Sequence, residues 1–298
     1  MAPGAPPPEG GTAGAYAGMT PLPFRSHFVR PIGNVVILLA LVAELAGAQA
    51  PDTTRRDKTF LTRRDLVTSG IALGATVLLS RYDDDIALAS RQPRFQTPGY
   101  TRFALNVSKV NETTLTLAGI LGYGIGRVTK SRTVTDVALH ATESVVLASL
   151  ASQIIRGPLG RARPYATSDT SQYDFQFGAG FRQGEAGFKR RAFPSIHTSS
   201  GMAAATVLTM EIHRRRPGAT PFVAPVIFAA GLLPGLVRVQ LDQHWASDVA
   251  AGAFMGVLAG YKVVSYSHAH PDNLFDRTLL KLSVTPTPNG IGLQFTPF

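Results

Sequence analysis

The sequence contains no cysteine, and this absence excludes several kinds of chemistry. A chain of 298 residues without a thiol has no disulfide framework, no thiolate nucleophile, no iron–sulfur cluster and no cysteine-ligated zinc. Charged residues are also scarce, since they make up 16% of the chain, whereas 45% of the residues are hydrophobic. Disordered chains have the opposite balance, so the sequence predicts a folded protein with a substantial core.

Negative charge is the scarcer of the two signs. The chain has 29 Lys and Arg against 19 Asp and Glu, which gives a formal net charge of +10 at neutral pH. A field of this sign favours phosphate groups, nucleic acid or anionic lipid as partners, and by itself it does not choose among them. The sequence contains no histidine–carboxylate cluster with the spacing of a metal-binding motif, so no metal site is expected.

The first 50 residues have the pattern of an export signal. Arg25 and Arg30 precede an apolar run, and Ala48-Gln49-Ala50 has the small-x-small pattern of a cleavage site. We therefore expect residues 1–50 to be a Pro/Gly-rich start and signal peptide, and residues 51–298 to be a single mature domain in the bacterial cell envelope. An uncleaved N-terminal anchor helix is the alternative.

The rest of the chain has the pattern of an all-α domain. Six apolar, Ala/Gly-rich stretches are bounded by helix caps or by Gly and Pro. They lie at residues 65–80, 113–128, 133–155, 195–213, 220–237 and 246–265. Two short apolar stretches around Pro288-Asn289-Gly290 predict a β-hairpin over residues 278–298. We expect a six-helix bundle with a small C-terminal β-hairpin.

The apolar stretches are mostly short for membrane spans, which need about 20 apolar residues. Residues 217–237 alone look long enough, and the mean hydropathy of the chain is only +0.10. The pattern therefore leaves open whether the bundle lies in a membrane or is a soluble periplasmic domain.

The first candidate site segment is Arg156, followed after six residues by Arg163-Pro164. Gly157, Pro158 and Gly160 are expected to end the preceding helix, so Arg156 should lie just beyond it. Guanidinium groups stay charged and offer forked donors that suit phosphate oxygens. Basic residues after a helix also complement its dipole, which is the simpler interpretation of this segment alone.

The second segment, Pro194-Ser195-Ile196-His197, opens the fourth apolar stretch. Ser195 is placed to cap the helix, and the free amides of Ile196 and His197 could bind a phosphate at the positive end of the helix dipole. An ordinary capped helix with a surface histidine explains this segment equally well.

The third segment is Arg238, five residues, His244, three residues and Asp248. On a helix, the spacing of four places His244 and Asp248 on one face. There the carboxylate can accept a proton from one imidazole nitrogen and leave the other nitrogen as a nucleophile. A surface ion pair has the same spacing, so this segment alone is also ambiguous.

Together and in this order, the three segments resemble the type 2 phosphatidic acid phosphatase and vanadium haloperoxidase superfamily. The family pattern is Lys, six residues, Arg-Pro; then Pro-Ser-Gly-His; then Ser-Arg, five residues, His, three residues, Asp. In this chain 29 residues separate Pro164 from Pro194, and 40 separate His197 from Arg238. The resemblance covers about residues 133–265 and implies the helical bundle of that superfamily.

Three positions depart from the family pattern. Arg156 replaces Lys and keeps the charge, while Val237 replaces Ser and loses a hydroxyl group. Ile196 replaces Gly, so a β-branched side chain stands where the backbone should approach the phosphate closely. We expect this change to reshape the oxyanion pocket.

The resemblance implies a metal-independent phosphatase that works through a phosphohistidine. It implies that His244, aligned by Asp248, attacks phosphorus, and that His197 protonates the leaving oxygen. The residues implied in phosphate binding are Arg156, Arg163, Ser195, Ile196 and Arg238.

The implied substrate is a phosphate monoester or a diphosphate. Lipid phosphates of the phosphatidic acid or isoprenyl diphosphate type are favoured, and the resemblance implies membrane association. No cofactor and no nucleic acid partner are expected, and vanadate should inhibit because it mimics phosphate. Whether the chain forms a homo-oligomer is left open.

Two alternative functions remain at this stage. A vanadium-dependent haloperoxidase would hold vanadate in the same pocket, and the presence of Ile196 suggests a catalytically silent envelope protein that binds phosphate or anionic lipid. Two other features are expected to be structural: Asp83-Asp84-Asp85 as a surface turn, and His140 as a satisfied interior histidine.

Overall fold

The computed structural model describes most of the chain beyond the expected signal peptide. The described residues are 60–167, 171–270, 273, 274 and 276, together with the backbone of residues 282–287 and 290–295. The expected signal peptide, residues 1–50, and the expected hairpin turn at Pro288-Asn289 therefore lie outside the described residues.

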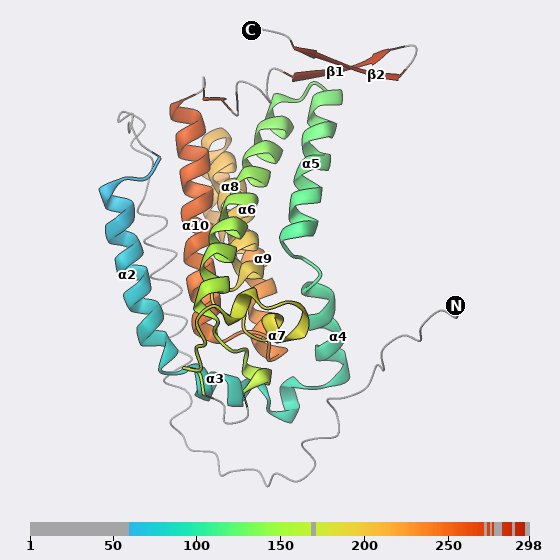
Figure 1. The fold of residues 1–298 in the computed structure, drawn as a ribbon. Coiled ribbons are helices and arrows are strands. Elements are labelled where there is room, and N and C mark those ends of the chain that lie inside the picture. The colour runs from blue at the N-terminus through green and yellow to red at the C-terminus, as the bar shows by residue number, and fades with distance from the viewer. Residues whose placement is uncertain are drawn as a thin grey trace.

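The described part of the chain is mostly helical, with nine α-helices arranged as a bundle (Figure 1). The helices are α2 (Arg63–Ser80), α3 (Asp83–Ser90), α4 (Pro98–Val107), α5 (Glu112–Val128), α6 (Arg132–Leu159), α7 (Gly184–Phe188), α8 (Ile196–Arg215), α9 (Thr220–Gln240) and α10 (Ala246–Ala269). Short 3-10 turns lie at η2 (Pro93–Phe95), η3 (Pro164–Ala166), η4 (Ala179–Phe181) and η5 (Pro217–Ala219). Strands β1 (Leu282–Thr287) and β2 (Gly290–Phe295) pair antiparallel, with Leu282 opposite Phe295.

Each of the six stretches expected from the sequence coincides with one long helix: α2, α5, α6, α8, α9 or α10. The described chain has three further helices, α3, α4 and α7, all of ten residues or fewer. The expectation that Asp83-Asp84-Asp85 forms a surface turn is wrong, because these residues form the first turn of α3, where carboxylates stabilise the helix dipole. Asp83 is fully buried.

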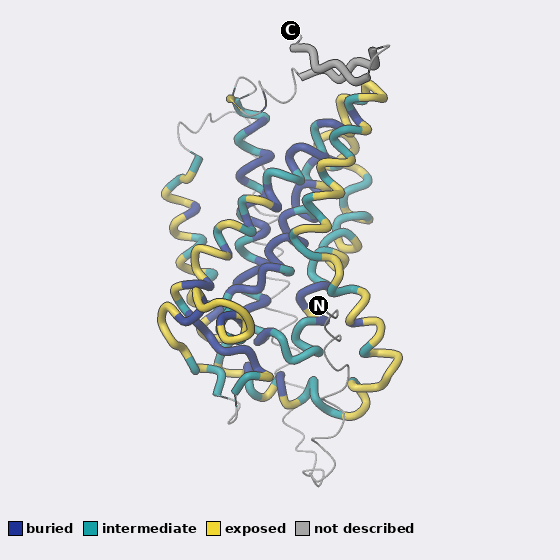
Figure 2. The backbone as a smooth tube through the Cα atoms, turned by 45° about the vertical axis from the view of Figure 1, so that its right-hand side comes forward, coloured by how far each residue is buried: buried dark blue, intermediate teal, exposed yellow. Residues whose placement is uncertain are grey.

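The core lies along α8 and α10, which have 12 and 14 buried residues, whereas α5 has one and α9 has three. Figure 2 shows buried residues, in dark blue, running through the middle of the bundle. Glycines at every fourth position of α10 make the close packing feasible. A Cβ atom on Gly252 or Gly256 would collide with a carbonyl oxygen of the Ser195–Ser199 segment. These glycines, the glycine stripe of α10, therefore allow the start of α10 to pack directly against the start of α8.

Helix α6 extends further than the sequence indicated. It continues through Gly157 and Pro158 and ends at Leu159, so Arg156 lies in its last turn rather than beyond it. Gly160 terminates the helix in the left-handed conformation, with φ of 61°, which glycine adopts without steric cost. The expected helix end at residue 155 was too early because a proline near the last turn removes only one amide donor.

Among the described residues, three helices are long and apolar enough to cross a membrane, judged by length and composition: residues 132–159, 217–240 and 246–269. The sequence pattern singled out only the second of these. The helix over residues 132–159 contains Asp136 and Glu143, which interrupt its apolar pattern, and both helices extend by about one turn beyond the expected ends at residues 155 and 265.

Candidate active site

The three motif segments meet at one end of the bundle. They lie at the C-terminal end of α6 with the loop that follows, at the start of α8, and at the α9–α10 connection, near α3 in the lower part of Figure 1. Backbone hydrogen bonds join them, from Ser195 N to Asp248 O at 3.0 Å and from Ala192 N to Arg161 O at 3.1 Å. Residues that are far apart in the sequence therefore form one continuous site.

His244 and Asp248 are both buried and face each other. His244 Nδ1 lies 3.5 Å from Asp248 Oδ2, and the two side chains are 0% exposed. The spacing of four brings them together for a different reason from the one expected, because His244 precedes the N-cap Trp245 and only Asp248 lies within α10. Asp248 Oδ2 also accepts from Trp245 N at 2.8 Å, so the carboxylate caps the helix and faces His244 at the same time.

The position of Asp248 indicates which ring nitrogen of His244 carries the proton. Since Asp248 faces Nδ1, that nitrogen is the one placed to donate a proton to the carboxylate, and Nε2 carries the free lone pair. Burial, together with Arg163, Arg238 and Arg156, lowers the pKa of His244 well below its ordinary value. The imidazole is therefore neutral and able to act as a nucleophile.

The three motif arginines lie around the histidines. Arg163 is 1% exposed and donates to three backbone carbonyls, those of Phe188, Arg191 and Gln243. Gln243 Oε1 also accepts from both Arg163 and Arg238, each at 3.2 Å, and so holds the two guanidinium groups together. Burial, followed by the neighbouring Arg156 and Arg238, lowers the pKa of Arg163 to about 9. Clustered cations of this kind attract a multiply charged anion.

The start of α8 has the form expected of an anion site. Ser195 occupies the N-cap position, but its hydroxyl caps no amide and instead accepts from Thr198 Oγ1 at 2.9 Å. The first amides of a helix have no intrahelical acceptor, so those of Ile196 and His197 are available to a ligand. The Ile196 side chain, which replaces the family glycine, is 3% exposed and is therefore packed inside the protein.

Several buried polar atoms of the site have no hydrogen-bond partner among the described residues. They are Arg156 Nε, Arg238 Nε, His197 Nδ1 and both ring nitrogens of His244. Buried donors in native proteins are nearly always satisfied, so unpaired donors on two arginines suit an oxyanion ligand. Burial, with Arg238, Arg156 and Arg163, also lowers the pKa of His197 to about 3, which a bound dianion would reverse.

Two residues that no sequence pattern indicated, Arg161 and Asp83, hold the site in place. Arg161 NH1 donates to Asp248 Oδ1 at 2.6 Å, and Arg161 NH2 donates to Asp83 Oδ2 at 2.8 Å. Asp83 also accepts from Ser247 N at 2.9 Å, and Arg161 is 2% exposed. Although burial opposes it, Asp248 and Asp83 raise the pKa of Arg161 above its ordinary value. The linked side chains of Asp83, Arg161 and Asp248 thus fix the position of the carboxylate that faces His244.

No spacing signal marks these two residues. Arg161 lies two residues before the motif Arg163, and Asp83 lies 78 residues before Arg161 in the chain. The only available signal was a third arginine in the Arg156–Arg163 segment, where two suffice for the motif.

Comparison with known proteins gives three findings. The sequence model of the PAP2 superfamily matches residues 137–271. The chain is 25% identical over 190 residues to the lipid A 1-phosphatase of Porphyromonas gingivalis, an alignment that covers 63% of this chain and 35% of that protein, so the chain spans about a third of its length. The chain is also similar to the transmembrane PAP2-type phosphatidylglycerolphosphate phosphatase of Bacillus subtilis, with a TM-score of 0.47, 18% identity, and coverage of 78% of this chain and 96% of that structure.

Proposed function

We propose that this chain, which belongs to the PAP2 superfamily over residues 137–271, hydrolyses lipid phosphates through a covalent intermediate on His244. The family match confirms the resemblance drawn from the three motifs. The observation that carries the proposal is the position of His244. Its imidazole is buried and neutral, faces Asp248 through Nδ1, and is surrounded by the guanidinium groups of Arg156, Arg163 and Arg238.

In the first step, His244 Nε2 attacks phosphorus, and the bond from phosphorus to the lipid oxygen breaks. The imidazole becomes positively charged as the N–P bond forms, and Asp248 stabilises that charge through Nδ1–H. Arg156, Arg163 and Arg238 hold the equatorial oxygens, and their positive charge stabilises the transition state. The leaving oxygen takes a proton from His197.

In the second step, water attacks the phosphohistidine. The N–P bond breaks, phosphate leaves, and His244 returns to its neutral form. His197, which lost its proton in the first step, accepts one from the attacking water. Every group that the two steps require belongs to the chain, so the proposed reaction needs no metal ion and no cofactor. Vanadate is expected to inhibit it as a phosphate mimic.

The substrate class follows from the surroundings of the site. Three described helices have the length and composition of membrane spans, and each carries a site residue at one end: Arg156 on α6, Arg238 on α9 and Asp248 on α10. A site at the end of spanning helices is placed to meet a phosphate at a membrane surface. The lipid A 1-phosphatase of P. gingivalis has a substrate of this kind. We therefore propose that the substrate is a lipid phosphate monoester or diphosphate and that it is cleaved at the cell envelope. The proposed enzyme class is that of the acid phosphatases and lipid phosphate phosphatases.

The decisive experiment measures phosphate release by the purified chain in the presence of a chelator. The panel contains phosphatidic acid, phosphatidylglycerolphosphate, an isoprenyl diphosphate, lipid A and a soluble aryl phosphate. We expect release of phosphate from at least one lipid. The loss of a positioned catalytic group lowers the turnover rate by about 100- to 1000-fold or more. His244→Ala should therefore lower turnover to background.

The intermediate provides an independent criterion. Rapid acid-free quenching with labelled substrate should trap label on the wild-type chain and none on His244→Ala. Wild-type turnover by the His244→Ala variant would refute the mechanism. A wild-type chain that binds phosphate but releases none from the panel would favour the silent binding protein, and bromide oxidation with vanadate and peroxide would favour the haloperoxidase.

A further inference from the structure

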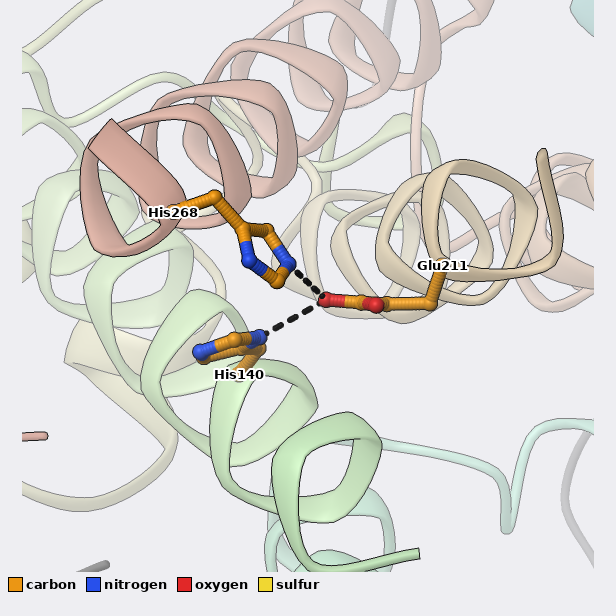
Figure 3. A group of neighbouring side chains, drawn as sticks. All are labelled: His140, Glu211 and His268. Atoms are coloured by element: carbon orange, nitrogen blue, oxygen red, sulfur yellow. Dashed lines mark hydrogen bonds and ion pairs between the residues drawn. The ribbon is translucent and has the colours of Figure 1, made fainter. Parts of the chain in front are cut away.

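Three side chains that the proposed reaction does not use meet inside the bundle: His140 of α6, Glu211 of α8 and His268 of α10 (Figure 3). Glu211 Oε1 lies 2.9 Å from His140 Nδ1 and 2.8 Å from His268 Nε2. One nitrogen or oxygen atom from each residue lies within 4.8 Å of the other two. His140 and Glu211 are almost fully buried, whereas the His268 side chain is 25% exposed. The cluster is therefore internal, with one member that reaches solvent.

Two further groups orient these side chains. Arg215 pairs with Glu211 Oε2, which leaves Oε1 directed at the two histidines. Asp276 Oδ1 lies 3.9 Å from His140 Nε2, on the opposite side of the ring from Glu211. A carboxylate behind a histidine is the usual arrangement at metal sites, where it fixes the ring and retains the proton on the outer nitrogen.

When His140 is neutral and the cluster holds no cation, one nitrogen of its ring has no hydrogen-bond partner among the described residues. A neutral His140 that donates Nδ1–H to Glu211 has an unprotonated Nε2, which then faces an oxygen of Asp276. Neither His140 Nε2 nor Asp276 Oδ1 has a hydrogen-bond partner among the described residues. A cation bound at Nδ1 would displace that proton and leave the ring proton on Nε2, the nitrogen that faces Asp276 Oδ1 across 3.9 Å.

The charge around the cluster also favours a cation. Asp136 lies 3.6 Å from Arg215, and Glu143, whose Oε1 is buried and unpaired among the described residues, interacts electrostatically with Asp276. Together with Glu211, these are four carboxyl groups, and Arg215 pairs with two of them, Asp136 and Glu211. Negative charge held inside a protein is costly unless a cation accompanies it.

We propose that His140, Glu211 and His268 bind a divalent transition-metal ion, and that Zn²⁺ fits the site best. Two imidazoles and one carboxylate are a common zinc ligand set, whereas Mg²⁺ and Ca²⁺ prefer oxygen ligands. Tetrahedral Zn²⁺ with bonds of about 2.0–2.2 Å places its ligand atoms about 3.4 Å apart. Glu211 must therefore retreat from each histidine by about half an ångström, and water takes the fourth position.

The ion would be structural rather than catalytic. Glu211 and His197 lie on the same helix, about 20 Å apart along its axis, so the cluster is far from the phosphate site. Its three ligands come from α6, α8 and α10, whose opposite ends carry the motif segments. Zinc would fasten these helices together at the end of the bundle away from His244. No metal site was expected from the sequence because its three ligands are far apart along the chain.

Metal content of the purified chain tests this proposal directly. The full chain is loaded with Zn²⁺, or with Co²⁺ as a spectroscopic probe, and dialysed against metal-free buffer. We expect one ion per chain and the visible absorption bands of tetrahedral Co²⁺. His268→Asn, which alters the partly exposed ligand, should lose both signals. Asp276→Asn should keep the ion and weaken its binding by about 10- to 100-fold, because it removes only the supporting carboxylate.

His213→Ala is the matched control, because His213 is exposed and lies on α8 two residues from Glu211. It should bind the ion as the wild type does. Chelation of the wild type should lower its melting temperature and leave kcat unchanged. A wild-type chain with no zinc above background, or equal zinc binding by the His268→Asn variant and the wild type, would overturn the proposal. Both readouts are independent of phosphatase activity.

Discussion

His244 depends on a second layer of residues that a motif search does not reveal. Asp248 would be a poor partner for an imidazole if it rotated freely, but Trp245 N and Arg161 hold one oxygen each. Arg161 in turn is held by Asp83, which comes from the short helix α3. The position of the proposed nucleophile therefore depends on a carboxylate that lies outside all three motifs and outside the family match.

Asp83→Asn should therefore lower kcat and leave KM nearly unchanged. A displacement of about 1 Å at a reacting group can cost about 100-fold in rate, and we expect a loss of up to that size. Steady-state kinetics on the purified variant provide the measurement. Asp85→Asn is the control, because Asp85 is in the same turn of α3 and is exposed. A kcat equal to wild type in Asp83→Asn would show that Arg161 positions Asp248 without it.

His197 makes stability depend on pH in a direction that its pKa determines. The folded protein holds the pKa of His197 at about 3, whereas the unfolded chain has the ordinary value of about 6.5. Below pH 6.5 the histidine is protonated in the unfolded state but not in the folded state. The contribution of His197 to the free energy of unfolding is therefore complete above pH 6.5 and is lost progressively as the pH falls toward 3. His197→Gln should lose less stability between pH 7 and pH 4 than the wild type, as measured by melting temperature.

The carboxylates also titrate in this range, and for that reason the comparison uses the difference between the two chains. Inorganic phosphate or vanadate should reduce the acid sensitivity of the wild type, because a bound anion favours protonated His197. Identical pH profiles for the wild type and His197→Gln would show that the histidine titrates normally in the folded protein.

At the level of elements, the glycine stripe of α10 decides how closely two motif segments approach. A Cβ on Gly256 would collide with the Ser199 carbonyl oxygen, which belongs to the backbone of α8 and cannot yield as a side chain does. Gly256→Ala should therefore destabilise the protein by about 1–3 kcal/mol, as other overpacked positions do. Thermal or denaturant unfolding in detergent measures this change.

Gly74→Ala on α2 is the matched comparison. It also replaces a helical glycine, but apart from its own helix no group of the described residues lies within 4 Å of the added Cβ. Alanine is a better helix former than glycine by up to about 1 kcal/mol, so this variant should be neutral or slightly stabilised. If both variants have the same stability, the close approach of α10 to α8 is not what holds the two segments together.

The long helices could be predicted because their signals are local. Apolar periodicity and capping residues lie within the element itself, and all six expected stretches fall in helices. Of the short helices, α4 had a readable start, since Thr97 caps it and Pro98 is its first residue, but its apolar pattern is only three turns long. Helix α3 was missed because three consecutive aspartates resemble a turn until Arg161 is placed beside them.

The site residues also differ in whether a local sequence signal identifies them. The motif residues could be predicted to lie together because the three segments keep their order and spacing, and the structure brings the segments together. Arg161, Asp83 and Gln243 could not be assigned, since their roles depend on partners from other segments. The same holds for His140, Glu211 and His268, which are far apart in the sequence and meet only when α6, α8 and α10 pack.

Over the whole molecule, the outer helices expose more apolar surface than a water-soluble bundle does. Large apolar side chains that are at least half exposed occur on three outer helices: Leu66, Val67, Ile71, Leu73, Val77 and Leu78 on α2, Leu117, Ile120, Leu121, Ile125 and Val128 on α5, and Phe222 and Val226 on α9. Exposed apolar side chains gathered on helices in this way mark a membrane or a partner interface. Three helices of spanning length within the same bundle favour the membrane.

We therefore expect the chain to remain in the membrane pellet after an alkaline carbonate wash, which releases peripheral proteins. Val226→Asp should lower the retained fraction, because Val226 is 69% exposed on α9 and a carboxylate within the hydrocarbon costs about 2.5–3.5 kcal/mol. Gln183→Asp adds the same charge at an exposed position near α7 and should change nothing. Equal retention of both variants would mean that α9 does not face lipid. Complete release of the wild type would mean that the site reaches its lipid from outside the membrane.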